Sequence, residues 1–311
     1  MNKRPLVSVF MPVYNQETLI SESIESVIDQ TFTDWELIIG DDCSDDDTFA
    51  VALKYQKRFP NKIRLFRNDV NLGITGNCNE VLKRCTGTYV AYTAGDDLFM
   101  PDKLEKQVAL MNSRPDCVLS FHDVEVFDSE TKSTIRYWNT GKEGSKPVVG
   151  RAVDVAKALV LQGTGFMSAL SVMVRRAAIP ISGYDNRVPM ASDWLMWIDI
   201  CANSQGTVEF IADTLARYRK HSQSITYVTK EDVTDNMVTL GLVEARYFWL
   251  REMARCRRGR EYYRQGVQLI LENEPKAGRA QIWVGAKTYI WSWKSLGWWL
   301  FSWLKQVIPR S

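Results

Sequence analysis

Two adjacent carboxylates, Asp96 and Asp97, follow the short apolar run Tyr89–Tyr92. This spacing places both at the carboxyl end of a predicted strand, where an open α/β sheet binds ligands. Neighbouring carboxylates are costly unless a cation neutralises them, and a divalent metal that holds a diphosphate would do so. The other interpretation is a simple turn and helix cap, with Pro101 and Asp102 opening the next helix.

The elements that must position these carboxylates alternate along the first half of the chain. Short apolar runs predict strands, and apolar residues at helical spacing predict the helices between them. The predicted strands are 6–11, 35–39, 63–66 and 89–93, and the predicted helices are 19–28, 50–59 and 74–85. This alternation favours a mostly parallel, Rossmann-like α/β sheet flanked by helices, whose first strands build a nucleotide pocket.

The loop after the first predicted strand lacks the glycine-rich pattern of a dinucleotide fold, and the chain has no P-loop motif. The loop reads Pro12-Val13-Tyr14-Asn15, which offers a rigid turn, an aromatic face for a base, and polar amide groups. The other interpretation of these residues is an ordinary strand-to-helix loop capped by Asn15 or Thr18.

Two more strand ends bring polar groups to the same edge. The segment 41–47 holds five carboxylates, most of which must be solvated or cap the helix that starts near Thr48. We expect Asp41 to point into the crevice and accept from a base N–H or a ribose hydroxyl. The residues Asn71 to Gly73 open the third helix. These segments, with Asp96 and Asp97, predict a ring of ligand groups.

The composition excludes several classes of protein. A chain of 311 residues is long enough for one large α/β domain with an appendage, and its net charge of +2 argues against a nucleic-acid partner. Six cysteines without a C-x-x-C pair and only two histidines argue against a zinc site. No signal segment or long apolar helix is evident, so we expect a cytoplasmic protein with reduced thiols.

In the order and spacing of its motifs the chain resembles the inverting family 2 glycosyltransferases, which have the GT-A fold. The resemblance covers about residues 5–226 and rests on Pro5–Asn15, Trp35–Ser44, Asn71–Gly73, Ala94–Asp97, Pro101–Gln107, Ser192–Trp194 and Tyr218–Ile225. The chain departs from the family pattern at Ala94 (often Asp), Cys78 (commonly Arg) and Ser192 (frequently Glu). The first departure affects the expected metal-ligand geometry, and the second affects the expected contacts with the base or phosphates.

The resemblance implies roles for individual residues. It implies Asp96 as a metal ligand, Asp97 as a further ligand or a sugar contact, and His221 as a third ligand for Mn²⁺ or Mg²⁺. It also implies Asp193 as the general base, although an Asp that begins a helix is otherwise a plain cap. The implied nucleotide-sugar contacts are Pro12, Val13, Tyr14, Asn15, Asp41, Asn71, Gly73, Asn79, Asp96, Asp97 and Arg219.

Substrates follow from the same resemblance. It implies a nucleotide diphosphate sugar donor, UDP-linked, and a glycan or lipid-linked saccharide acceptor of a bacterial surface polymer. Acceptor specificity is expected in residues 128–190. His122 follows a predicted strand at 118–121 and lies either near the acceptor or in a structural role. A sugar-1-phosphate nucleotidyltransferase would need a glycine-rich basic loop after the first strand. A catalytically inactive, membrane-docked scaffolding module is the alternative from another class.

The carboxyl-terminal region differs from the rest of the chain. We expect a catalytic domain at 1–226, with a nucleotide half at about 1–127 and an acceptor half at about 128–226, and a helical region at 227–311. Residues 276–311 carry a charge of +6 and six of the eleven tryptophans. Tryptophan and cations are typical of an interfacial helix, which predicts peripheral attachment to the inner face of the cytoplasmic membrane. Packing on protein is the alternative.

Overall fold

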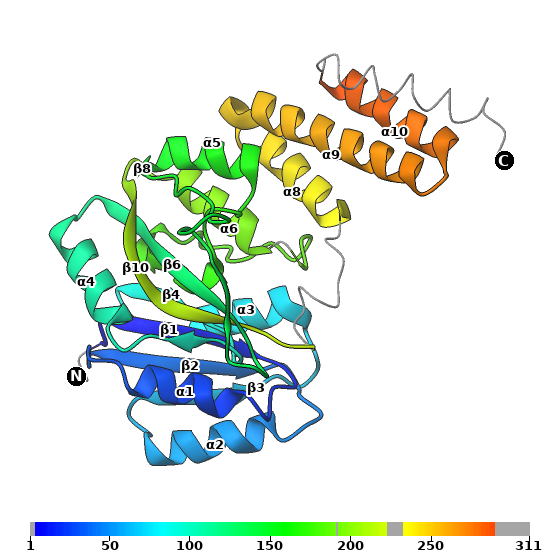
Figure 1. The fold of residues 1–311 in the computed structure, drawn as a ribbon. Coiled ribbons are helices and arrows are strands. Elements are labelled where there is room, and N and C mark those ends of the chain that lie inside the picture. The colour runs from blue at the N-terminus through cyan, green and yellow to red at the C-terminus, as the bar shows by residue number, and fades with distance from the viewer. Residues whose placement is uncertain (1–3, 191, 223–232, 290–311) are drawn as a thin grey trace. The chain divides into compact units, whose positions relative to one another are not determined.

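Strands and helices alternate through the first half of the chain in this computed structural model, which describes residues 4–190, 192–222 and 233–289 (Figure 1). The elements in chain order are β1 (Val7–Val13), α1 (Ile20–Ile28), β2 (Trp35–Asp41), α2 (Thr48–Arg58), β3 (Ile63–Arg67), α3 (Gly73–Arg84), β4 (Tyr89–Tyr92), β5 (Leu98–Phe99) and α4 (Lys103–Ser113). All seven predicted elements are confirmed with ends within two residues of those predicted, and β1 extends two residues into the expected loop.

The second half is less regular, as expected from its weak sequence pattern. Its main elements are β6 (Cys117–Asp128), β7 (Thr134–Tyr137), β8 (Gly150–Arg151), α5 (Ala152–Gln162), β9 (Met173–Arg175), α6 (Ser192–Ala202) and β10 (Thr207–Lys220). One expectation is wrong, because the strand predicted at 118–121 continues to Asp128 as β6. Pairing with β9, β10 and β7 covers this strand along its length, so His122 lies within it rather than after it.

One sheet joins both halves in the order β3-β2-β1-β4-β9-β6-β10-β5. The pairs β2–β3, β1–β2, β1–β4 and β6–β10 are parallel, whereas β9 runs antiparallel to both β4 and β6. The carboxyl ends of β1, β2, β3 and β4 therefore lie at one edge of the sheet, as the sequence pattern requires.

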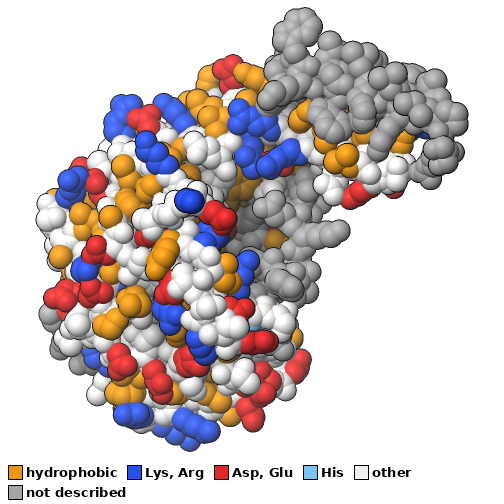
Figure 2. All heavy atoms as spheres, viewed as in Figure 1, with side chains coloured by type: hydrophobic (Ala, Val, Ile, Leu, Met, Phe, Trp, Pro, Cys, Tyr) orange, Lys and Arg blue, Asp and Glu red, His pale blue; other side chains and the backbone are white. Residues whose placement is uncertain are grey.

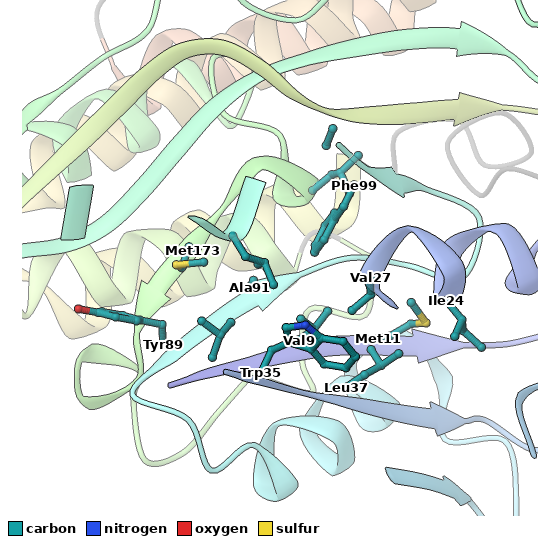
Figure 3. Packing of buried hydrophobic residues seen from close by; sticks show 14 of the residues in the cluster. Val9, Met11, Ile24, Val27, Trp35, Leu37, Tyr89, Ala91, Phe99 and Met173 are labelled. Atoms are coloured by element: carbon teal, nitrogen blue, oxygen red, sulfur yellow. The ribbon is translucent and has the colours of Figure 1, made fainter. Parts of the chain in front are cut away.

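Alternate side chains of the central strands feed two apolar layers. On one face, Val9, Met11 and Leu37 pack with Ile24 and Val27 of α1, and the helices α2 and α4 add to the same core (Figure 3). On the other face the ring of Tyr92 lies 4.9 Å from Phe10 and 5.0 Å from Trp197 of α6, centroid to centroid. Both faces are thus buried, which explains the continuous apolar runs of the first strands.

Gly40 shows how closely α3 approaches the sheet. A Cβ atom at this position would lie 2.5 Å from the side chain of Val81 and 2.9 Å from that of Asn77. A larger residue in β2 would therefore push α3 away, and with it the loop that follows β3.

Contacts divide the chain into two compact units, residues 1–159 with 163–231, and residues 160–162 with 232–311. The second unit contains α8 (Val233–Arg246), α9 (Arg251–Leu271) and α10 (Pro275–Thr288). The helices α9 and α10 pack closely because glycines face each other, and a Cβ at Gly266 would lie 2.6 Å from the carbonyl oxygen of Gly278. None of the described helices is long and apolar enough to cross a membrane.

Three expectations fall partly or wholly outside the described residues. They are the domain boundary at 226, the last residues of the Tyr218–Ile225 motif, and the tail beyond residue 289 with five of its six tryptophans. The sixth, Trp283 in α10, has 55% of its surface exposed. On the face shown in Figure 2, cationic and anionic side chains are interspersed, in keeping with the nearly balanced composition.

Candidate active site at the carboxyl end of the sheet

Hydrogen bonds join the loop after β1 to the loop after β2. The Asn15 N–H donates to Ser44 Oγ at 3.0 Å, and the Asp45 N–H donates to Asn15 Oδ1 at 2.9 Å. Asn15 has a φ of 52°, a left-handed conformation that asparagine tolerates better than most residues. Tyr14 is 44% exposed beside this junction. The segment Pro12–Asn15 is therefore fixed in place, and the Tyr14 ring remains accessible to a ligand.

Asp41 and Asp42, at the end of β2, are both buried and hydrogen-bonded within the protein. Asp41 accepts from the Ser44 hydroxyl and from the Ser44 N–H at 3.2 Å, and Arg67 Nε lies 3.4 Å from its carboxylate. Burial raises the pKa of Asp41, and the Ser44 hydrogen bonds oppose that rise. Asp42 Oδ1 accepts from Asn68 Nδ2 at 2.8 Å and from the Leu72 N–H at 2.9 Å.

Two asparagines that lie outside the predicted ligand groups, Asn68 and Asn77, connect the ends of β2 and β3 to helix α3. The Asn77 amide donates to the Gly40 carbonyl at 2.8 Å, and Asn68 Nδ2 lies 3.1 Å from Asn77 Oδ1. A polar Asn77 among the buried residues of α3 is the signal that could have identified it. Asn71 Oδ1 accepts from the Gly73 N–H at 2.9 Å, and Gly73 has a φ of +73°, which explains the glycine.

Asn79 lies further along α3, away from these loops. Its Nδ2 donates to the Tyr184 carbonyl at 3.0 Å, and its Oδ1 accepts from the Tyr184 N–H at 2.8 Å. It lines an open groove of about 850 Å³ between α3 and residues 176–189. In this structure the Asn79 amide therefore fixes the backbone at Tyr184.

The Asp96–Asp97 turn is placed by a close contact and by a strand pairing. A Cβ at Gly95 would lie 2.7 Å from the Val13 side chain, so glycine lets the turn approach the end of β1. The antiparallel pairing of Leu98 with Arg217 brings the turn to the end of β10. There Asp96 Oδ2 lies 3.0 Å from His221 Nε2, and Asp97 Oδ1 accepts from the Arg219 N–H at 2.9 Å.

The two carboxylates of this turn have different surroundings. Asp97 is only 5% exposed, whereas the Asp96 side chain is partly open to solvent. Burial raises the pKa of Asp97 well above its usual range, and the charge of Asp96 adds to the rise. A cation at this turn would relieve the unfavourable charge of the pair.

Arg219 is the largest charged side chain buried at the site. Its Nε donates to the Asp96 carbonyl at 2.7 Å, and its Nη2 donates to Glu22 Oε2 at 2.6 Å. The guanidinium also lies 5.1 Å from the Phe127 ring centroid. Glu22 could not be identified from the sequence, because nothing in the periodicity of α1 distinguishes it from a solvated acidic residue.

Asp96 and His221 have the right chemistry for a divalent metal. A carboxylate oxygen and an imidazole nitrogen are both suitable ligands for Mn²⁺, and a carboxylate suits Mg²⁺. In the described part of the chain no group of three His, Cys, Asp or Glu side chains could hold a metal ion. Diphosphate oxygens and water would have to complete the coordination, which agrees with a site that holds metal and nucleotide together.

Asp193 occupies the first turn of α6, as expected from the sequence. Its Oδ1 accepts from the Trp194 N–H at 2.7 Å, and burial raises the pKa of Asp193. Burial raises the pKa values of Cys78 and Tyr184, and the charge of Asp193 adds to the rise, so Asp193 lies near Cys78 of α3 and near Tyr184. The hydroxyl of Thr75, in the first turn of α3, donates to the Val188 carbonyl at 3.0 Å and anchors the segment before Asp193.

His122 belongs to a buried polar cluster. Its Nε2 lies 3.1 Å from Lys103 Nζ, and its Nδ1 lies 2.7 Å from the Asp123 carbonyl. Lys103 also donates to Gln107 Oε1 at 2.6 Å. Burial lowers the pKa of His122 well below its usual range, and the charge of Lys103 lowers it further. These contacts give His122 the structural role that the sequence left open.

The arrangement as a whole has the fold of the GT-A glycosyltransferases. The solved structure of S. aureus TarS 1–349 in complex with UDP-GlcNAc superposes with a TM-score of 0.64 at 17% identity, covering 91% of this chain and 81% of that chain. The mannosyltransferase PcManGT from Pyrobaculum calidifontis, in complex with GDP-Man and Mn²⁺, gives a TM-score of 0.57 at 16% identity, covering 99% of this chain and 82% of that chain.

Sequence comparison agrees with the fold. Residues 8–154 of this chain match the model of glycosyl transferase family 2. This chain is 40% identical to the Escherichia coli UDP-Glc:alpha-D-GlcNAc-diphosphoundecaprenol beta-1,3-glucosyltransferase WfgD over 106 residues. The aligned residues make up 34% of this chain and 41% of that protein. The chain spans less than half the length of the first curated relatives it matches.

Proposed function

We propose that this protein is a metal-dependent inverting glycosyltransferase that takes its sugar from a UDP-linked donor. The observation that carries the proposal is the pairing of Asp96 with His221, 3.0 Å apart at the carboxyl end of the sheet, in a chain whose residues 8–154 match the model of glycosyl transferase family 2. Neighbours of the same fold bind UDP-GlcNAc or GDP-Man, which supports a nucleotide-sugar donor.

The loops at the sheet edge have separate tasks in this proposal. Pro12–Asn15 and Asn71–Gly73 contact the nucleotide, with the exposed Tyr14 ring against the base. Asp41 acts through the Ser44 turn that supports Asn15, because its own carboxylate is buried. Asn79 acts indirectly too, by fixing the backbone at Tyr184.

Asp96 and His221 would hold Mn²⁺ or Mg²⁺, with Asp97 beside them. The cation supplies the positive charge that stabilises a diphosphate leaving group. Asp193 acts as the general base and takes the proton of the acceptor hydroxyl. The acceptor oxygen forms a bond to the anomeric carbon as the bond from that carbon to the phosphate oxygen breaks, and the nucleoside diphosphate leaves. Attack from the face opposite the leaving group inverts the configuration.

We propose a glycan or a lipid-linked saccharide of a surface polysaccharide as the acceptor. The name of WfgD describes a sugar transfer to a diphosphoundecaprenol-linked saccharide, which supports a lipid-linked acceptor here. An enzyme that uses such an acceptor works at a membrane surface, in line with the expectation for residues 276–311. Deletion of 290–311 is expected to reduce flotation with anionic vesicles and to leave donor hydrolysis unchanged. Equal flotation of the truncated chain would contradict the membrane role of the tail.

A donor screen tests the proposed activity directly. The full chain is incubated with UDP-, GDP- and dTDP-linked sugars, and release of nucleoside diphosphate is measured with Mn²⁺, with Mg²⁺ and with excess chelator. We expect release from a UDP-linked sugar with either metal and none with chelator. Undiminished release in excess chelator, or none from any donor with metal present, would contradict the proposal. The variant Asp96→Asn serves as the control for contaminating hydrolases.

A further inference from the structure

We propose that Arg219, held in turn by Glu22, is a positioning residue that sets the Asp96–Asp97 turn against His221. This inference rests on the proposed function, since it assigns a task to a residue of the same site. It also replaces the expected contact of the Arg219 side chain with the nucleotide sugar.

The contacts of Arg219 leave its guanidinium pointing inward. Its side chain is fully buried, whereas the side chain of Glu22 is 49% exposed. Nε donates to the Asp96 carbonyl and Nη2 to Glu22 Oε2, while Nη1 lies 3.5 Å from Ser129 Oγ. A planar guanidinium can donate to several separate acceptors at once, because its N–H groups point in fixed directions. One side chain of β10 thus links the turn after β4 to the helix after β1.

The main chain of Arg219 makes a second contact with the Asp96–Asp97 turn. Its N–H donates to Asp97 Oδ1 at 2.9 Å, and the His221 ring, two residues later, lies 3.0 Å from Asp96 Oδ2. Two residues at the end of β10, Arg219 and His221, thus hold the carbonyl of Asp96 and the carboxylates of Asp96 and Asp97. The direction in which Asp96 presents its oxygens therefore depends on Arg219.

Glu22 completes the arrangement by balancing the buried cation. A buried arginine is stable only when anionic or carbonyl groups accept its hydrogen bonds. The Arg219 hydrogen bond is the main cause that lowers the pKa of Glu22, as expected for a carboxylate paired with this cation. Removal of the Glu22 charge should loosen the guanidinium and, through it, the Asp96 carbonyl, without altering any group that faces a ligand.

Two variants separate positioning from ligand binding. Glu22→Gln keeps the size of the side chain and removes its charge. Arg219→Lys keeps the charge but cannot donate to the Asp96 carbonyl and to Glu22 with the fixed geometry of a guanidinium. Asp154→Asn is the matched control, because Asp154 is also partly exposed and pairs with two cations, Arg151 and Lys157. Thermal unfolding of each variant verifies that it folds.

The first measurement needs neither metal nor nucleotide. Hydrogen–deuterium exchange of the peptide that contains residues 94–99 is followed in the metal-free full chain. We expect about tenfold faster exchange in Glu22→Gln and Arg219→Lys, the change that corresponds to loss of one hydrogen bond to a charged group. Asp154→Asn should exchange as the wild type does. Exchange equal to wild type in both test variants would overturn the positioning role, whatever the activity of the protein.

The second measurement connects the turn to the ligand. Calorimetry with UDP at increasing Mn²⁺ concentration gives the Mn²⁺ concentration needed for half-maximal nucleotide binding. We expect this concentration to rise several-fold in Glu22→Gln and to stay at the wild-type value in Asp154→Asn. Wild-type behaviour of Glu22→Gln would overturn the inference. Failure of the wild type itself to bind UDP with Mn²⁺ would instead contradict the proposed function, while the exchange result still decides the role of Arg219.

Discussion

Two pairs of adjacent aspartates stand at the same edge of the sheet and differ in what surrounds them. Asp41 and Asp42, after β2, accept hydrogen bonds from Ser44, Asn68 and the Leu72 N–H, all within the protein. Asp96, after β4, is partly exposed and faces His221. The same two-residue pattern thus gives a structural support in one place and a candidate metal site in the other.

The difference comes from the donors that each loop supplies. The loops after β2 and β3 contain Ser44 and Asn68, short polar side chains that donate to the buried carboxylates of Asp41 and Asp42. The turn after β4 contains few donors of its own and receives them from β10. A carboxylate with fewer internal partners retains its capacity for an external cation. The comparison therefore predicts opposite consequences when each pair is altered.

The largest effect is expected from Asp96→Ala. Transfer should fall by at least about 10²- to 10³-fold, the usual result of removing a group that stabilises transition-state charge, while the midpoint of thermal unfolding changes little. Release of nucleoside diphosphate at saturating donor, together with a melting curve, checks both parts. A large loss of thermal stability with activity retained would show that Asp96, like Asp41, has a structural role.

Asp193→Asn should slow transfer by about 10²- to 10⁴-fold, the range typical of a lost general base. Donor binding should remain, because in our account Asp193 contacts the acceptor rather than the diphosphate. Calorimetry with UDP and Mn²⁺ separates the two effects. Loss of UDP binding in this variant, combined with its retention in Asp96→Ala, would reverse the two assignments.

The pH dependence of transfer sharpens the role of Asp193 further. Burial raises the pKa of Asp193, and a general base must be deprotonated. The rate at saturating substrates should therefore fall about tenfold per pH unit below this raised pKa and level off above it. In Asp193→Asn this acidic limb should disappear from the residual activity. An unchanged acidic limb in the variant would show that another group titrates.

The smallest effect is expected from Ser44→Ala, which tests the structural pair. It removes the hydroxyl that donates to Asp41 and accepts from the Asn15 N–H, so the free energy of unfolding should fall by about 1–3 kcal/mol near pH 7. Because the pKa of Asp41 is raised in the folded state, its ionisation costs stability as the pH rises, and the deficit should shrink as the pH falls through this raised pKa. Urea unfolding near pH 7 and at successively lower pH values measures this. A deficit that grows toward acid pH would contradict the account.

The fold of the first half could be predicted because β1, β2 and β4 are buried on both faces and the helices carry one apolar stripe. The pairing of Asp96 with His221 was also accessible, through the family resemblance. The burial of Arg219 and the saturation of Asp41 could not be predicted, since they depend on Glu22 and Ser44, whose contacts come from tertiary structure. The length of β6 was missed because its polar residues, such as His122 and Asp123, are satisfied by partners distant in sequence.

The most direct test of the account is a Mn²⁺ titration of UDP binding in three proteins, the wild type, Asp96→Asn and Ser44→Ala. Calorimetry at each Mn²⁺ concentration gives the metal requirement of nucleotide binding. The account predicts that UDP binding stays metal-dependent in the wild type and in Ser44→Ala, even where Ser44→Ala weakens UDP binding through Asn15, and that the metal-dependent component is lost in Asp96→Asn. Metal-dependent binding that survives in Asp96→Asn and disappears in Ser44→Ala would contradict the assignment of the metal site to the second aspartate pair.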